Sequence, residues 1–271
     1  MQTLAILSGS GALPFQLSKA YPEAMRVVFH GVEHRLLAPV SEHRFDQLGA
    51  LFDDMRANGI TDVVFAGGMA RPPLDPTQFD ATMMTLAPRL MAAFQSGDDA
   101  VLRLVIAIFE EQGFNVVGAH ELMPEITAQE GLIAGEEPSA SHLSDAARAT
   151  DILLALSPLD VGQGAVVAHG LCLGIETLQG TDALLGFVAD TPERLRRQKG
   201  GVLVKIPKRG QDLRVDMPAI GPETIHNAAK AGLDGIVVSA GKVVILDREA
   251  TPSPRLFSRP SATSKLGPLR R

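Results

Sequence analysis

Short apolar runs alternate with amphipathic stretches along the first 117 residues of the chain. Runs of about four to eight apolar residues have the length of buried strands, whereas apolar residues three and four apart indicate helices. Strands are predicted at residues 3–7, 26–30, 62–66 and 114–117, and helices at residues 12–20, 45–57, 86–94 and 98–112. Alternating strands and helices predict a Rossmann-like α/β domain, with a parallel sheet and ligand loops at the carboxyl ends of its strands.

The pattern weakens between residues 120 and 138, where acidic residues, prolines and a glycine replace the apolar runs. We place the domain boundary there and predict an N-terminal domain at 1–134 and a C-terminal α/β catalytic domain at 135–271. In the second domain, helices are predicted at residues 144–156, 182–189, 192–198 and 222–231, and strands at residues 164–167, 171–176 and 201–206. The apolar pair within residues 235–246 predicts a hairpin that turns at 240–242.

Composition and charge exclude several classes of protein. The chain is 45% hydrophobic with 26 Gly and 18 Pro, which fits a turn-rich α/β protein. A net charge of −6 and few aromatic residues argue against a nucleic-acid binder, which needs basic surface and stacking side chains. The single cysteine, Cys172, excludes an internal disulfide and a cysteine-based zinc site. Because Cys172 lies in an apolar run, we expect a buried structural thiol.

No targeting or membrane-spanning segment is recognisable. The chain starts without a basic region, and the most apolar helical stretch, residues 101–109, contains Arg103. We therefore expect a cytoplasmic protein, with contact at a membrane surface left open. The basic, Pro- and Ser-rich tail from about residue 251 is expected to be disordered, with weak attraction to anionic lipid as the alternative.

Residues 211–224 carry the strongest chemical pattern, because charged and apolar side chains alternate there. In an extended strand, Asp212, Arg214 and Asp216 would share one face and apolar residues the other. Carboxylates beside an arginine suit a divalent cation next to a phosphate. The Gly-Pro pair at 221–222 predicts a helix start, whose N–H groups can bind an anion at the same place. The alternative is an edge strand with a surface ladder of charges.

The turn Gly9-Ser10-Gly11 follows the first predicted strand and precedes a helix, which predicts a phosphate-binding loop. It begins like the dinucleotide fingerprint G-x-G-x-x-G, but Pro14 stands in place of the third glycine. Glu33 follows at roughly the spacing of a ribose-binding acid, so nicotinamide binding stays open. A tight structural turn is the other interpretation.

Two further loops follow predicted strands. In GGMARP, Gly68 allows close backbone approach and Arg71 is placed to meet a phosphate, unless the loop is only a flexible turn. Thr181 either caps the next helix or bonds a phosphate, and Asp182 is a second candidate carboxylate. A local basic run that includes Lys205 favours a compact anion such as a diphosphate.

Together these motifs resemble the UDP-2,3-diacylglucosamine pyrophosphatases of the LpxI type, enzymes of lipid A biosynthesis in some Gram-negative bacteria. The resemblance spans nearly the whole chain, through ILSGSGALP, GGMARP, IETLQGTDALL, GGVLVKIPKRGQDLRVDMPAIGPETI and AGLDGIVVSAGKVVI. Gln179 departs from the glutamate of many relatives, so no ligand role is assigned to it. The resemblance implies two linked α/β domains that close around a substrate cleft. It also implies Mg²⁺-dependent hydrolysis of UDP-2,3-diacylglucosamine to UMP and 2,3-diacylglucosamine 1-phosphate, with water attacking the phosphorus nearer the sugar.

The family's key acidic residue carries over onto Asp216, which we expect to hold Mg²⁺. Asp212 and Asp182 are further candidates for catalysis, through the metal or by positioning water. The expected substrate-binding residues are Gly9, Ser10, Gly11, Gly68, Arg71, Thr181, Lys205 and Arg214.

The substrate's two acyl chains require an apolar cleft, for which the Met-rich stretch at 83–91 is a candidate, unless it packs in the core. Peripheral contact with the inner membrane surface stays open, and the sequence does not determine the oligomeric state. Two other classes also remain: a nicotinamide-dependent oxidoreductase using Gly9, Gly11 and Glu33, and a non-catalytic nucleotide- or lipid-binding protein.

Overall fold

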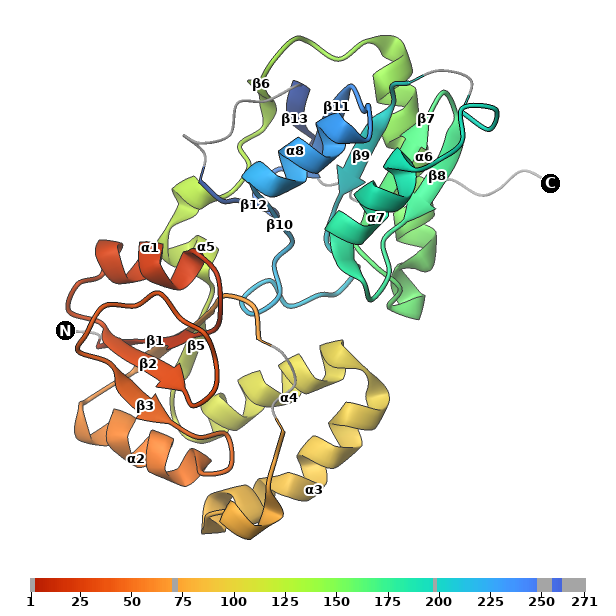
Figure 1. Ribbon diagram of the computed structural model, residues 1–271. Helices are drawn as coiled ribbons and strands as arrows, with labels where there is room; N and C mark the ends of the chain where they lie inside the picture. Colours follow the sequence, from red (N-terminus) through yellow and green to blue (C-terminus); the bar gives the residue numbers. More distant parts are fainter. Residues whose placement is uncertain (1–2, 70–72, 197–198, 248–254, 260–271) are drawn as a thin grey trace. The chain divides into compact units, whose positions relative to one another are not determined.

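We describe the computed structural model over residues 3–69, 73–196, 199–247 and 255–259 (Figure 1). The chain folds into two compact units. The N-terminal unit comprises Met1–Pro124 and Asp212–Asp216, and the C-terminal unit comprises Glu125–Gln211 and Met217–Arg271. The division after Pro124 falls inside the boundary region at 120–138, earlier than the position predicted at residue 134. A short segment from the second half of the sequence thus belongs to the N-terminal unit.

A five-stranded parallel sheet organises the N-terminal unit, in the order β3-β2-β1-β4-β5. Its strands are β1 Leu4–Ser8, β2 Met25–Phe29, β3 Ser41–His43, β4 Asp62–Ala66 and β5 Asn115–Val117. The chain leaves β1 toward β2 on one side and returns to β4 on the other, so the strand order reverses between β1 and β4 as in Rossmann folds. The predicted Rossmann-like domain is confirmed.

The helices of this unit begin and end at recognisable local signals. They are α1 Leu13–Ala20, α2 Leu48–Ala57, α3 Ala81–Ser96, α4 Asp98–Glu111 and α5 Ala119–Leu122, with a 3-10 turn at Pro76–Gln78. The α2 helix stops where Gly59 takes a left-handed φ of 67°. Asp80 caps α3 by accepting a hydrogen bond of 2.7 Å from the N–H of Met83, so α3 begins before the predicted start at residue 86.

The core of the N-terminal unit is built from aliphatic side chains and a group of phenylalanines. The rings of Phe52 and Phe109 meet edge to face with centroids 5.1 Å apart. Met83 is buried in this core, whereas Met84 and Met91 are exposed. Part of the Met-rich stretch is therefore ordinary helix–core packing.

A six-stranded mixed sheet organises the C-terminal unit, in the order β6-β13-β11-β9-β7-β8. Strands β13, β11 and β9 are mutually parallel, and β6, β7 and β8 pair antiparallel. The strands are β6 Gly131–Ala134, β7 Gly164–Ala168, β8 Leu171–Ile175, β9 Val202–Lys205, β11 Gly235–Ser239 and β13 Arg255–Arg259. A separate parallel pair joins β10 Ala219–Ile220 to β12 Val244–Ile245. The second predicted α/β domain is confirmed.

Alternate residues of these strands pack against helices on opposite faces of the sheet. On β7, Val166 belongs to the cluster that includes α7 and α8, while Ala165 and Val167 belong to the cluster with α6 (Figure 1). The helical segments are η2 Pro124–Ile126, α6 Ala140–Leu156, η3 Ser157–Leu159, α7 Gly180–Ala189 and α8 Pro222–Lys230. The α8 helix starts with Pro222 in its first turn, as the Gly-Pro pair predicts.

Several predictions for the C-terminal half are wrong. Residues 192–196 form turns, with the Leu195 N–H donating to the carbonyl of Pro192 at 2.9 Å, and the end of the predicted helix lies outside the described residues. The predicted hairpin does not form, because β11 and β12 join different sheets. Residues 255–259 of the expected disordered tail form β13, and the rest of the tail lies outside the described residues. Cys172 is exposed on β8, so the prediction of a buried thiol is also wrong.

Every helix in the described part of the chain lacks the combination of length and apolarity needed to cross a lipid bilayer.

Candidate functional site

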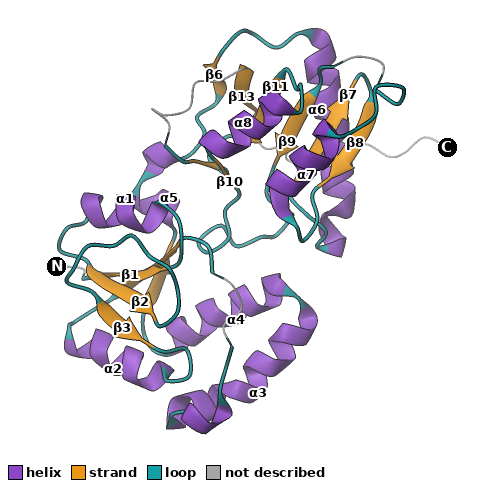
Figure 2. Cartoon of the chain, viewed as in Figure 1, coloured by secondary structure: helices purple, strands orange, loops and turns teal. Residues whose placement is uncertain are grey.

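The segment around the two aspartates is a turn rather than a strand (Figure 2). A carboxylate oxygen of Asp212 accepts the N–H of Arg214 at 3.0 Å, and the carbonyl of Asp212 accepts the N–H of Asp216 at 3.2 Å. Aspartate side chains stabilise turns in this way by bonding the backbone two residues onward. The predicted extended strand is therefore wrong here, and regular pairing begins only at β10.

Arg214 holds this turn through its whole guanidinium group. Its Nε and Nη2 donate to the carboxylate of Asp212 at 3.0 and 2.7 Å, and its Nη1 donates to Glu110 at 2.8 Å and to the carbonyl of Val116 at 3.4 Å. These hydrogen bonds raise the pKa of Arg214, and the same bonds from Arg214 lower the pKa of Asp212. Val215 packs against the core of the N-terminal unit. In this arrangement Arg214 and Asp212 position the turn, and Asp216 follows at its end.

Asp216 is partly buried in the N-terminal unit. Among the described residues, no group of three or more His, Cys, Asp or Glu side chains is placed to hold a metal ion. Mg²⁺ is commonly held by one or two carboxylates together with waters and substrate phosphates. The carboxylate of Asp216 fits that mode of binding, and the donor set does not form an all-protein metal cage.

The predicted glycine loops of β1 and β4 are joined to each other. The N–H of Ser10 donates to the carbonyl of Gly68 at 2.7 Å, and the N–H of Gly68 donates back at 3.0 Å. A Cβ on Gly9 would lie 2.3 Å from the carbonyl oxygen of Gly68, so Gly9 serves this close backbone approach. By contrast, Gly11 has φ of 96°, and a Cβ at this position would have no atom of the described residues within 4 Å. Arg71 lies outside the described residues.

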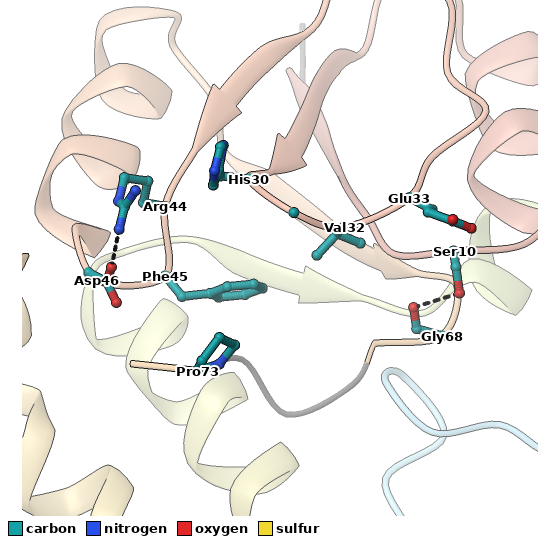
Figure 3. A pocket seen from close by; sticks show the side chains of 10 residues that line it. Ser10, His30, Val32, Glu33, Arg44, Phe45, Asp46, Gly68 and Pro73 are labelled. Carbon is teal, nitrogen blue, oxygen red and sulfur yellow. Dashed lines mark hydrogen bonds and ion pairs between the residues drawn. The ribbon is translucent and has the colours of Figure 1, made fainter. Parts of the chain in front are cut away.

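A cavity of about 460 Å³ opens beside these loops at the carboxyl ends of the strands, and we call it the β1–β3 cavity (Figure 3). Its walls come from Ser10 after β1, residues 30–33 after β2, residues 44–46 after β3, Gly68 after β4, and Pro73. It therefore contains Glu33, the candidate ribose-binding acid. No sequence pattern indicated Phe45 and Arg44 as site residues, because strand β3 has only three residues and gives too weak a signal to locate the loop that follows it.

A second polar cluster lies in the C-terminal unit, where β8, α7 and β9 meet. Lys205, at the end of β9, is 8% exposed and donates to the hydroxyl of Thr181 at 2.5 Å. Thr181 in turn donates to Glu176 at 3.1 Å, and the Glu176 carboxylate lies 3.9 Å from the Lys205 ammonium. The second oxygen of Glu176 is buried without a hydrogen-bond partner in the described part of the chain. Thr181 lies within α7 rather than at its N-cap, where Gln179 stands, so the capping interpretation is wrong.

Asp182 lies one residue further along α7, and its carboxylate accepts a hydrogen bond of 3.0 Å from Asn227. The candidate residues thus fall into two sets, each gathered within its own unit. Asp212, Arg214, Asp216 and the glycine loops belong to the N-terminal unit, and Thr181, Asp182 and Lys205 belong to the C-terminal unit. Glu176 joins the second set through its contacts with Thr181 and Lys205, which no sequence pattern indicated.

Comparison with known proteins matches both units. The family model of the LpxI N-terminal domain matches residues 3–126, and that of the LpxI C-terminal domain matches residues 129–253. The chain is also similar to the UDP-2,3-diacylglucosamine pyrophosphatase LpxI of Caulobacter vibrioides, with 42% identity over 260 residues and 92% of each chain covered.

Proposed function

The chain belongs to the LpxI family, and from this membership we propose that it hydrolyses the diphosphate of UDP-2,3-diacylglucosamine in lipid A biosynthesis. The observation that carries the proposal is the 42% identity over 92% of both chains to a UDP-2,3-diacylglucosamine pyrophosphatase. The two family models match residues 3–126 and 129–253, so the family match covers the segments that carry both sets of candidate residues.

In the proposed reaction, a water oxygen bonds to the phosphorus nearer the sugar while the bond from that phosphorus to the bridging oxygen breaks. The bridging oxygen leaves with UMP, the sugar keeps its phosphate as 2,3-diacylglucosamine 1-phosphate, and the water's protons pass to solvent. Such a reaction mainly requires a positioned water and neutralised phosphate charge. In this proposal Lys205 and Thr181 contact phosphate oxygens, and the open backbone at Gly11 lets the diphosphate approach closely.

We propose that Asp216 holds Mg²⁺ together with the substrate's phosphates. The bound ion would supply charge neutralisation at the diphosphate. Asp212 and Arg214 act on Asp216 through the turn, because their hydrogen bonds fix the backbone from which the Asp216 side chain projects. This replaces the expected phosphate contact of Arg214 with a positioning role.

The test is UMP release from UDP-2,3-diacylglucosamine by the wild type and Asp216→Ala, each with Mg²⁺ or with EDTA. We expect Mg²⁺-dependent release by the wild type and a loss of at least about a hundredfold in Asp216→Ala, the scale of removing one preorganised electrostatic group from an active site. Asp53→Ala is the matched control, since this carboxylate is 81% exposed and pairs with Arg56 at 3.1 Å on the surface of α2. Absence of release by the wild type with Mg²⁺, Mn²⁺ and Ca²⁺ would overturn the proposal.

The substrate's two acyl chains suggest that the enzyme meets it at a membrane surface. We therefore also propose peripheral contact with the inner membrane, without a spanning helix. Co-sedimentation with vesicles containing the substrate, compared with vesicles lacking it, tests this contact.

A further inference from the structure

The β1–β3 cavity has the position of a nucleotide site in a parallel α/β sheet. Ligands of such sheets bind outside the carboxyl ends of the strands, where the strand order reverses. Here the order reverses between β1 and β4, and the bridge from Ser10 to Gly68 marks that point. From there the cavity extends past the end of β2 to the end of β3. Its volume of about 460 Å³ is within the range of small-molecule sites.

The residues around the cavity change in character from one end to the other. Figure 3 shows Ser10, Gly68 and Glu33 together at one end and Arg44 with Asp46 at the other, with Phe45 and Val32 between them. The first end combines backbone and a hydroxyl with an exposed carboxylate. The middle is apolar, and the far end carries a guanidinium group.

The apolar middle is held in place by the core. The ring of Phe45 stacks on Phe29 with centroids 4.2 Å apart and planes 7° apart, and Phe29 is buried in β2. The stacking fixes the Phe45 ring before any ligand arrives, so this wall of the cavity is preorganised for a flat aromatic group. Preorganised walls reduce the entropy lost on binding.

The far end presents hydrogen-bond donors. Arg44 donates to Asp46 at 2.7 Å, and Asp46 is 4% exposed and also accepts the N–H of Asp75 at 3.3 Å. This buried carboxylate orients the guanidinium, whose other N–H groups can donate toward the cavity. The uracil ring carries two carbonyl acceptors, whereas cytosine has an amino donor in place of one of them. An arginine that donates to the 4-position of the base therefore favours the O4 carbonyl of uracil over the amino group of cytosine.

We propose that the β1–β3 cavity binds the uridine part of the substrate, with the ribose hydroxyls on Glu33, the uracil ring against Phe45 and its carbonyl edge toward Arg44. In this pose the diphosphate extends out of the cavity at the end formed by Ser10 and Gly68. This inference rests on the proposed function for the identity of the nucleoside, and it assigns Glu33 to a ribose without requiring a nicotinamide cofactor.

The test compares UMP with 2′-deoxy-UMP on the wild type and on Glu33→Gln by isothermal titration calorimetry. A charged acceptor of a ribose hydroxyl contributes about tenfold in affinity. We expect the wild type to prefer UMP over 2′-deoxy-UMP by about tenfold, and Glu33→Gln to lose that preference. Glu33 is exposed, so the variant should fold, and Glu23→Gln is the matched control at an exposed glutamate of the same unit. CMP should bind the wild type more weakly than UMP.

Parallel assays separate this inference from the proposed function. If the wild type cleaves UDP-2,3-diacylglucosamine but its preference for UMP over 2′-deoxy-UMP survives in Glu33→Gln, the cavity assignment is wrong and the proposed function stands. If Glu33-dependent UMP binding occurs without cleavage, the cavity assignment stands and the proposed function falls. Binding of NADH in preference to UMP would overturn both.

Discussion

The Lys205→Met variant tests whether Glu176, Thr181 and Lys205 form a coupled buried cluster in the C-terminal unit. The side chains of Lys205 and Glu176 are 10% and 13% exposed, so their charges interact where water screens them little. Methionine keeps most of the volume of the lysine stem and removes the ammonium group. It would leave the Glu176 carboxylate with only the Thr181 hydroxyl as a partner among the described residues.

Removing one partner of a buried ion pair costs about 3–5 kcal/mol, because the remaining charge stays buried and unpaired. The separation of 3.9 Å between Nζ and Oε1 is at the long end for an ion pair, which places the expected cost near the lower limit, about 3 kcal/mol. Neutralising both residues in Lys205→Met with Glu176→Gln removes the unpaired charge. We expect the double variant to lose only about 1 kcal/mol, which is about 2 kcal/mol less than Lys205→Met loses alone.

The assay is differential scanning calorimetry at pH 7 on the wild type, the two single variants and the double variant, with Lys230→Met as the control at an exposed lysine. One transition should move down in Lys205→Met and recover in the double variant. UMP release should stay low in both, because the proposed phosphate contact of Lys205 is absent from each. Equal destabilisation of Lys205→Met and the double variant would refute the coupling between the two charges.

The N-terminal unit supports three further predictions. Arg214→Met should lower the free energy of unfolding by about 1–2 kcal/mol, because the ion pairs of Arg214 are only partly exposed. The control is Arg89→Met, which removes an exposed ion pair and should change the free energy of unfolding by less than about 0.5 kcal/mol. Urea titration measures both changes. Arg214 lowers the pKa of Asp212 from its ordinary 3.8, so the stability from this pair is present above pH 3.8 and is lost as the pH falls through the lower folded value. The difference between the wild type and Arg214→Met should therefore be constant from about pH 7 to 5 and shrink below about pH 4, and a constant difference down to pH 2 would contradict it. Gly9→Ala should cost about 1–3 kcal/mol because its Cβ would lie 2.3 Å from the Gly68 oxygen, and an unchanged melting temperature would contradict that packing.

Elements with strong local signals were predictable from the sequence. Strand β4 has the predicted bounds, and α2 ends at the Asn58-Gly59 stop signal. The Rossmann-like sheet was also predictable from the sequence, because alternating strands and helices leave few arrangements other than a parallel sheet. The glycine turns were correctly placed after β1 and β4, although their bonds to each other depend on strands that lie side by side only in the fold.

Other features depend on partners that are distant in the sequence. The alternation of charged and apolar residues around Asp212 is compatible with a strand as well as with a turn. Only the contacts of Arg214 with Glu110 and Val116 distinguish the turn. Strand β13 has the composition of a disordered tail, yet it pairs with β11 on one side and β6 on the other. The Phe45 wall of the β1–β3 cavity likewise depends on stacking with Phe29 across two strands.

The turn at Asp212–Asp216 affects how the protein folds during its own translation, because it belongs to the N-terminal unit but is synthesised long after the rest of that unit. A ribosome that has made only the first unit has not yet made Val215, which completes its core, or Arg214, which pairs with Glu110. The N-terminal unit must therefore wait for much of the C-terminal unit before it can finish folding. An isolated fragment ending near residue 126 would lack both contacts, so gene division at the apparent domain boundary should yield a less stable N-terminal half.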